Sequence, residues 1–183
     1  MGLYRQTVED FGLYSGLELT EEQMSALRSA AGKMSAKMRA VRIVSATSVS
    51  RRDLEERLVR KGEDPVQAKE AVQWMEELHL VDDRNTAEQV VHSCISKGYG
   101  IARAKQALYE KRIPKQYWDA VLNDYPDQSD KIESFLRSRL DADSDQKEIK
   151  RAIDGLLRRG HSYGTIRRVL NNLSFDAEDF LEE

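Results

Sequence analysis

The feature that most constrains the fold is a helical pattern that recurs three times along the chain. Three segments superpose when Leu58, Leu108 and Leu170 are aligned: DLEERLVRKGED, RAKQALYEKRIP and TIRRVLNNLSFD. A second apolar position precedes the first by four residues in each copy: Leu54, Ala104 and Ile166. Residues four apart lie on the same face of an α-helix. The pattern therefore predicts an internal helical repeat with a period of roughly 50 to 60 residues, whose units bury their apolar faces on one another.

Stop and restart signals accompany each copy of the pattern. Gly62 suits the left-handed position that ends a helix, and Asp64-Pro65 restarts the chain. Similar punctuation occurs at Lys97-Gly98, Ile113-Pro114 and Arg159-Gly160. We expect an all-α fold, an elongated array of three tandem three-helix repeats with an additional N-terminal segment. The expected boundaries are a partly extended segment at 1–20, N-terminal helices with the first repeat at 21–82, the second repeat at 83–126 and the third at 127–183.

The first long helix is expected to begin after Thr20, because Thr20 and Gln23 have the spacing of a capping box. Gly32 is a candidate break in that helix. Aromatic residues make up 7% of the chain and only three prolines interrupt it, which favours helices over a sheet. No stretch resembles a membrane span or a signal peptide. These observations predict a monomeric cytoplasmic protein that does not contact membranes.

The residue types that enzymes and metal sites require do not converge. His92 and Cys94 are two residues apart, so on a helix they point to different faces and cannot easily share a metal ion. Cys94 lies in an apolar stripe and is expected in the core, whereas all three histidines are expected at the surface or its boundary. Asp82-Asp83 is interpreted as a helix cap. We therefore expect no catalytic residues, no metal and no cofactor.

Charge is distributed in blocks, although the formal net charge is only −3. Residues 28–61 contain ten Lys and Arg against three acidic residues, and residues 63–88 contain eight acidic residues against two basic ones. Such blocks can create a strong local field on a nearly neutral chain. The alternative interpretation of each block is a solvated helix face with pairs of opposite charge four residues apart.

Four motifs in order resemble those of RecX proteins. They are Arg52-Asp53-Leu54-Glu55-Glu56-Arg57-Leu58 with Arg60-Lys61-Gly62; Leu80-Val81-Asp82-Asp83; Lys97-Gly98-Tyr99-Gly100 with Arg103, Lys105, Leu108 and Lys111; and Leu156-Leu157-Arg158-Arg159-Gly160 with Ser162-Tyr163 and Ile166-Arg167. The resemblance covers nearly the whole chain after about residue 11. Ile101 and His161 depart from it, since they stand where the family commonly has Pro and an aromatic residue.

The resemblance implies a modular, all-helical regulator that is not an enzyme. It implies that the protein lodges in the groove of the RecA–DNA filament and modulates, usually restrains, ATP hydrolysis and strand exchange in recombination and DNA repair. A weak direct contact with DNA is also expected.

Basic residues at the starts of the repeats, with one tyrosine beside two glycines, are the candidate partner-binding residues. They are Arg51, Arg52, Arg57, Arg60, Lys61, Lys97, Tyr99, Arg103, Lys105, Arg158, Arg159, Arg167 and Arg168. Two other functions stay open. The first is a direct nucleic-acid-binding helical repeat protein, against which stand the sequence pI of about 5.8 and the lack of a clear aromatic stacking platform. The second is a helical adaptor for another partner.

Overall fold

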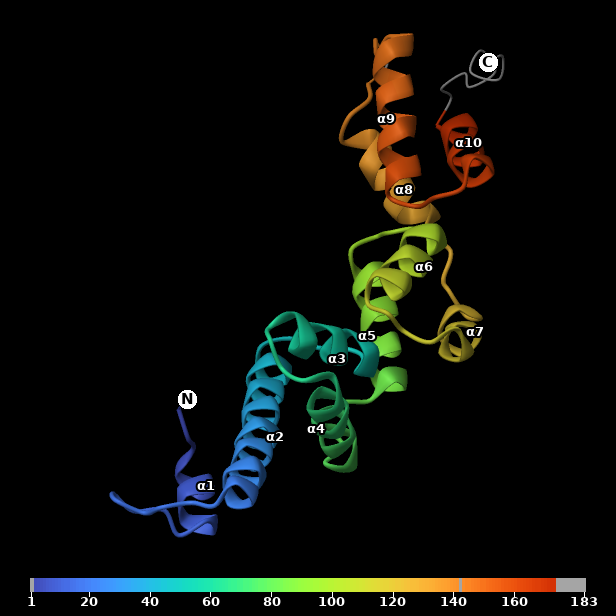
Figure 1. Ribbon diagram of the computed structural model, residues 1–183. Coiled ribbons are helices and arrows are strands. Elements are labelled where there is room, and N and C mark those ends of the chain that lie inside the picture. The colour runs from blue at the N-terminus through green and yellow to red at the C-terminus, as the bar shows by residue number, and fades with distance from the viewer. Residues whose placement is uncertain (1, 142, 174–183) are drawn as a thin grey trace. The chain divides into compact units, whose positions relative to one another are not determined.

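The protein is all-helical throughout the residues that the computed structural model describes, 2–141 and 143–173 (Figure 1). These residues form ten α-helices and one short 3₁₀ helix and contain no strand. The α-helices are α1 (Arg5–Asp10), α2 (Glu21–Ala46), α3 (Arg51–Arg60), α4 (Pro65–Glu77), α5 (Asp83–Ser96), α6 (Ile101–Glu110), α7 (Trp118–Leu122), α8 (Ser129–Arg137), α9 (Gln146–Arg158) and α10 (Tyr163–Asn172); the 3₁₀ helix is η1 (Lys115–Tyr117). The chain divides into two compact units, Met1–Thr86 and Ala87–Glu183.

The first unit is built on α2, which packs against both α3 and α4. The predicted capping box is present, because the Thr20 hydroxyl accepts from the Gln23 amide and the Gln23 side chain accepts from the Thr20 amide. The predicted break at Gly32 is wrong, since α2 runs through this residue without interruption. A Cβ at position 32 would lie 2.6 Å from Nε2 of Gln67 on α4, so this glycine leaves room for the end of a flexible side chain and does not end the helix.

The N-terminal segment, predicted as partly extended, contains the short helix α1, which lies against α2. No apolar repeat in the sequence predicts this helix. Thr7 is its buried residue.

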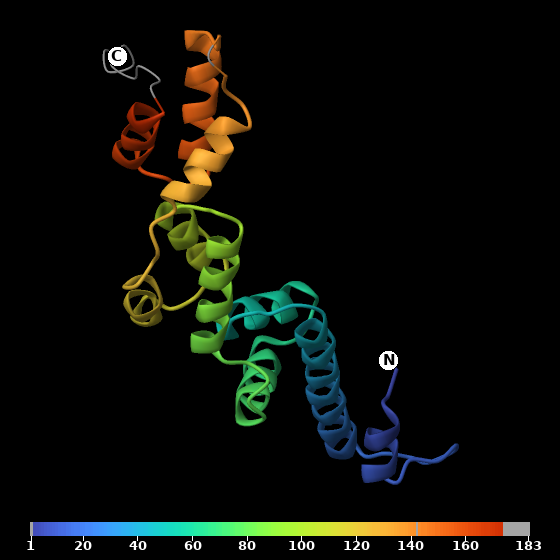
Figure 2. The ribbon, with the colours of Figure 1, turned by 180° about the vertical axis from the view of Figure 1, so that it is seen from behind.

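The second unit contains two apolar cores. One gathers α5, α6 and α7 around Ala104 and Leu108, and the other gathers α8, α9 and α10 around Leu136, Leu156 and Leu170. Figures 1 and 2 show α8, α9 and α10 as a group of three neighbouring helices. Cys94 is buried in the first of these cores, as its apolar surroundings in the sequence predict.

The three segments that superpose in the sequence form helices α3, α6 and α10, each ten residues long. Both aligned apolar positions are fully buried in all three copies: Leu54, Leu58, Ala104, Leu108, Ile166 and Leu170. Each helix follows another helix after a short loop, α2, α5 and α9 respectively. The third copy also has α8 before this pair. The repeat boundaries at 82 and 126 stay predictions.

Candidate functional site

A hollow in the second unit is lined by five arginines. This cavity of about 310 Å³, the arginine pocket, is lined by Tyr99, Arg103, Phe135, Arg139, Arg151, Gly155, Arg158 and Arg159. Its lining comes from the loop between α5 and α6, the first turn of α6, the end of α8 and one face of α9. Residues remote in sequence therefore meet at one place.

Helix α9 has two faces of opposite character. Arg151, Gly155 and Arg158 are spaced by four and three residues, which places them on one face toward the pocket. The other face is apolar and buried: Ile149, Ala152, Ile153 and Leu156. The helix begins with a capping box in which Asp145 accepts from the Glu148 amide and Glu148 accepts from the Asp145 amide. Burial of the apolar face thus presents the basic face to the pocket.

Two equivalent loops bring Arg103 beside Arg159. The loop between α5 and α6 meets the loop between α9 and α10 so closely that a Cβ on Gly100 would overlap the carbonyl group of Gly160. Two backbone hydrogen bonds join them: the Gly100 amide donates to the Arg159 carbonyl at 2.9 Å, and the Ala102 amide donates to the Gly160 carbonyl at 3.3 Å. Tyr125 also donates its hydroxyl to the Tyr99 carbonyl at 2.7 Å, and burial raises the pKa of Tyr125 to about 12.

His161 forms part of the same junction, so its predicted surface or boundary position is wrong. The residue is only 7% exposed, and its Nε2 lies 3.0 Å from the Gly98 carbonyl, to which the neutral ring donates. Burial lowers the pKa of His161, and the nearby Arg159 charge lowers it further. Sequence reasoning failed here because Gly98 is remote in sequence and their contact depends on how the two loops pack.

Phe135 organises two of the pocket's guanidinium groups. The Arg139 and Arg159 guanidinium carbons lie 4.5 Å and 4.6 Å from the ring centroid, the range of cation–π contacts. Arg103 pairs with the exposed Glu110 at 3.1 Å. Among the described residues, no carboxylate lies within ion-pair distance of the other four pocket arginines.

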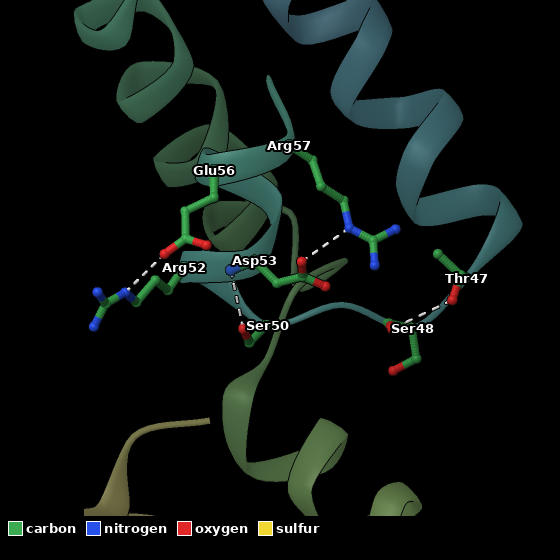
Figure 3. Close-up of polar contacts among 7 residues, drawn as sticks. All are labelled: Thr47, Ser48, Ser50, Arg52, Asp53, Glu56 and Arg57. Atoms are coloured by element: carbon green, nitrogen blue, oxygen red, sulfur yellow. Dashed lines mark hydrogen bonds and ion pairs between the residues drawn. The ribbon is translucent and has the colours of Figure 1, made fainter. Parts of the chain in front are cut away.

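Three of the candidate basic residues on α3 form ion pairs with carboxylates. Arg52 pairs with Glu56 at 3.1 Å and Arg57 with Asp53 at 2.9 Å, both within the helix (Figure 3). Arg51 pairs with Glu76 of α4 at 2.8 Å. For these residues the structure favours the alternative interpretation of solvated, internally compensated charge.

The structure brings together four of the thirteen candidate residues, Tyr99, Arg103, Arg158 and Arg159. The other nine lie outside the pocket lining: Arg51, Arg52 and Arg57 on α3, Arg60 and Lys61 at its end, Lys97 at the end of α5, Lys105 on α6, and Arg167 and Arg168 on α10. Sequence reasoning missed Phe135, Arg139, Arg151 and Gly155. The spacing of basic residues along α9 could have indicated Arg151 and Gly155. The sequence of α8 and of the residues after it gave no indication of Phe135 or Arg139.

The part of the chain that the structure describes contains no cluster of potential metal ligands. No group of three or more His, Cys, Asp or Glu residues there could hold a metal ion. Burial raises the pKa of the Cys94 thiol, which disfavours the nucleophilic thiolate. Asp82 accepts from the Arg84 and Asn85 amides, so it caps α5 as predicted. Within the same residues, no helix is long and apolar enough to cross a membrane.

The fold and the pocket define a class of protein, an all-helical protein with a basic pocket. Comparison with known proteins identifies the family. Residues 82–122 match the family model described as "RecX, second three-helix domain". The chain is 32% identical over 142 residues to the regulatory protein RecX of Chlorobaculum tepidum, covering 75% of this chain and 88% of that protein. It is 25% identical over 190 residues to the regulatory protein RecX of Clostridioides difficile, covering 98% of this chain and 87% of that protein.

Solved structures agree on the fold. A crystal structure of a regulatory protein RecX matches with a TM-score of 0.68 at 20% identity, covering 92% of this chain and 86% of that one. RecX from Lactobacillus salivarius matches with a TM-score of 0.67 at 22% identity, covering 79% of this chain and 98% of that one. The chain belongs to the RecX family of regulatory proteins.

Proposed function

We propose that this protein binds the RecA–DNA filament and restrains ATP hydrolysis and strand exchange by the recombinase. Family membership carries the proposal, because the resemblance of the motifs to RecX proteins implies this partner. The curated relatives are named regulatory proteins, which fits action through binding rather than through a reaction of the chain's own. We also propose that the protein acts in the cytoplasm as a monomer and needs no cofactor.

Repeated helical units suit a filament as partner. Each repeat presents its own polar surface, so contacts of modest strength on separate repeats can act together on one filament. The blocks of like charge can complement a charged groove of the filament. Such complementarity chiefly accelerates the encounter between the two partners and fixes the register in which they bind. Partner contacts in this proposal include the basic residues of the arginine pocket and the exposed Arg60, Lys61, Lys97 and Lys105.

Sedimentation tests the proposal against its main rival. RecA filaments assembled on single-stranded DNA with a non-hydrolysable ATP analogue are mixed with the protein and pelleted, alongside DNA without RecA and RecA without DNA. We expect the protein to pellet with the filament and much less with either component alone. Equal pelleting with DNA in the absence of RecA would instead identify a direct nucleic-acid-binding protein.

A further inference from the structure

We propose that the arginine pocket is a site for the phosphate groups of a nucleic-acid backbone. The proposal concerns the second unit alone and does not require the recombinase as partner. It rests on the uncompensated charge of the pocket, on the way its guanidinium groups are held, and on the side chains that are absent from its lining.

The pocket groups five arginines whose charge is largely uncompensated, in contrast to several basic side chains of the first unit. In that unit Lys33 pairs with Glu70 at 3.1 Å and Arg39 with Glu63 at 2.6 Å. Within the described residues, Arg103 is the only pocket arginine with such a partner. Guanidinium groups keep their charge in proteins, so grouping five of them costs free energy that a bound anion would recover.

Two of the five guanidinium groups in the pocket are held in place before any ligand arrives. Phe135 supports Arg139 and Arg159 through ring contacts, which leave the in-plane N–H groups available as donors. Gly155 allows the ring to lie close to α9, because a Cβ there would be 3.2 Å from Cζ of Phe135. Side chains held in this way lose less conformational entropy on binding, which favours affinity.

The number and arrangement of donors fit phosphate better than a carboxylate. A carboxylate presents two oxygens and one charge, which a single guanidinium fork can satisfy. Five guanidinium groups, from α6, from α9 and from the residues that follow α8 and α9, line a space of about 310 Å³. This volume is about ten times the share of one water in liquid water, roughly 30 Å³. This space accommodates consecutive phosphates with their sugars, and a backbone of repeated charge compensates several arginines together.

The same lining predicts binding that does not depend on base sequence. No Asn, Gln, Asp or Glu lines the pocket, and these side chains are the ones that read adenine and cytosine edges. Arginine can read guanine, but a guanidinium group that contacts a phosphate is not available to a base edge. The Phe135 ring already carries two guanidinium groups, so base stacking on it is not expected. Phosphate contacts would therefore position the strand without selecting a sequence.

Fluorescence anisotropy with a labelled single-stranded oligodeoxynucleotide of mixed sequence tests the site on the whole 183-residue chain. The variant is Arg151→Ala/Arg158→Ala, at two exposed positions of α9 that line the pocket. The matched control is Lys147→Ala/Lys150→Ala, which removes the same charge from exposed positions of the same helix outside the pocket lining. Circular dichroism and urea unfolding check that both variants keep the fold.

We expect the pocket variant to lose about tenfold or more in affinity at low salt, and the control less than about threefold. The slope of log affinity against log salt should fall by about 1.4 in the pocket variant, since each lost contact to a single strand contributes about 0.7. Equal losses in both variants would overturn the pocket assignment in favour of diffuse attraction. Displacement of the oligonucleotide by polyglutamate as readily as by polyphosphate would also overturn it and identify a site for acidic protein segments.

The outcomes of these experiments distinguish failure of the phosphate site from failure of the proposed function. The phosphate site fails if the pocket variant binds the naked oligonucleotide like the control, whatever the recombinase does. The proposed function fails if the wild-type protein leaves RecA filaments unaffected while its binding to naked DNA follows the pocket. Each result can therefore be obtained without the other.

Discussion

Replacing Gly100 with alanine should disrupt the junction that builds the arginine pocket. The backbone of Gly100, with φ −76° and ψ 164°, is one that alanine adopts readily. The difficulty lies in space, because the added Cβ would overlap the Gly160 carbonyl and would lie 2.5 Å from the His161 amide nitrogen. This is about 1 Å inside ordinary van der Waals contact, and the obstacle is backbone, which cannot rotate away as a flexible side chain can.

The structure sets the size of the effect. Overpacking in a close-packed region costs about 1–3 kcal/mol. Moving the loops apart also lengthens the hydrogen bonds from the Gly100 amide to the Arg159 carbonyl and from the Ala102 amide to the Gly160 carbonyl, each worth about 0.5–1.5 kcal/mol. Because one displacement causes both losses, they are not fully additive. We expect the free energy of unfolding of the second unit to fall by about 2–4 kcal/mol.

Urea unfolding followed by tryptophan fluorescence measures this change. Trp118 lies in the second unit and Trp74 in the first, so a Trp74→Phe background reports the second unit alone. The control is Gly164→Ala, because a Cβ at this exposed position of α10 meets nothing within 4 Å. That control should be neutral or stabilising by up to about 1 kcal/mol. If Gly100→Ala is as stable as Gly164→Ala, the close backbone packing of the two loops is refuted.

Three further predictions concern the buried polar and apolar groups. Glu63→Ala should lower the free energy of unfolding by about 1–3 kcal/mol in urea titrations, because this 8%-exposed carboxylate accepts from Ser35 and Arg39; the exposed pair of Glu70 should contribute less than about 1 kcal/mol. Burial lowers the pKa of His161 below 6.5, so the unfolded chain binds its proton first as the pH falls. The free energy of unfolding of the wild type should therefore fall, relative to that of His161→Gln, as the pH is lowered from about 7.5 to about 5.5, a range that spans the ordinary histidine pKa. Parallel pH profiles of the two proteins would contradict this. Leu108→Ala should cost about 2–5 kcal/mol in thermal or urea unfolding, since the side chain is fully buried, whereas Leu157→Ala at a 41%-exposed position should cost far less.

The helical repeat could be predicted because its determinants are local. Apolar residues four apart define a buried face wherever the helix packs, so Leu58, Leu108 and Leu170 could be aligned without tertiary information. Caps are equally local, and Thr20 begins α2 as its sequence indicates. Gly32 misled the prediction because glycine occurs both at helix ends and inside helices, and here it lies inside α2 beside the side chain of Gln67.

The arginine pocket could be predicted only in part because it depends on packing between helices. Arg158 and Arg159 stood out through their motif, but Phe135 and Arg139 become relevant only when the end of α8 lies beside α9. The charge blocks were equally ambiguous in sequence. Pairing to Glu56 distinguishes Arg52 from Arg158, although both residues carry the same charge and both belong to motifs of the family.

The most direct test of the central claim is the rate of ATP hydrolysis by RecA on single-stranded DNA as this protein is titrated in. The account predicts a rate that falls in a saturable way, and a weaker effect for Arg151→Ala/Arg158→Ala than for Lys147→Ala/Lys150→Ala. The protein added to a DNA-free control should change nothing. A rate that stays constant at concentrations well above those that bind naked DNA would contradict the claim that this chain regulates the recombinase filament.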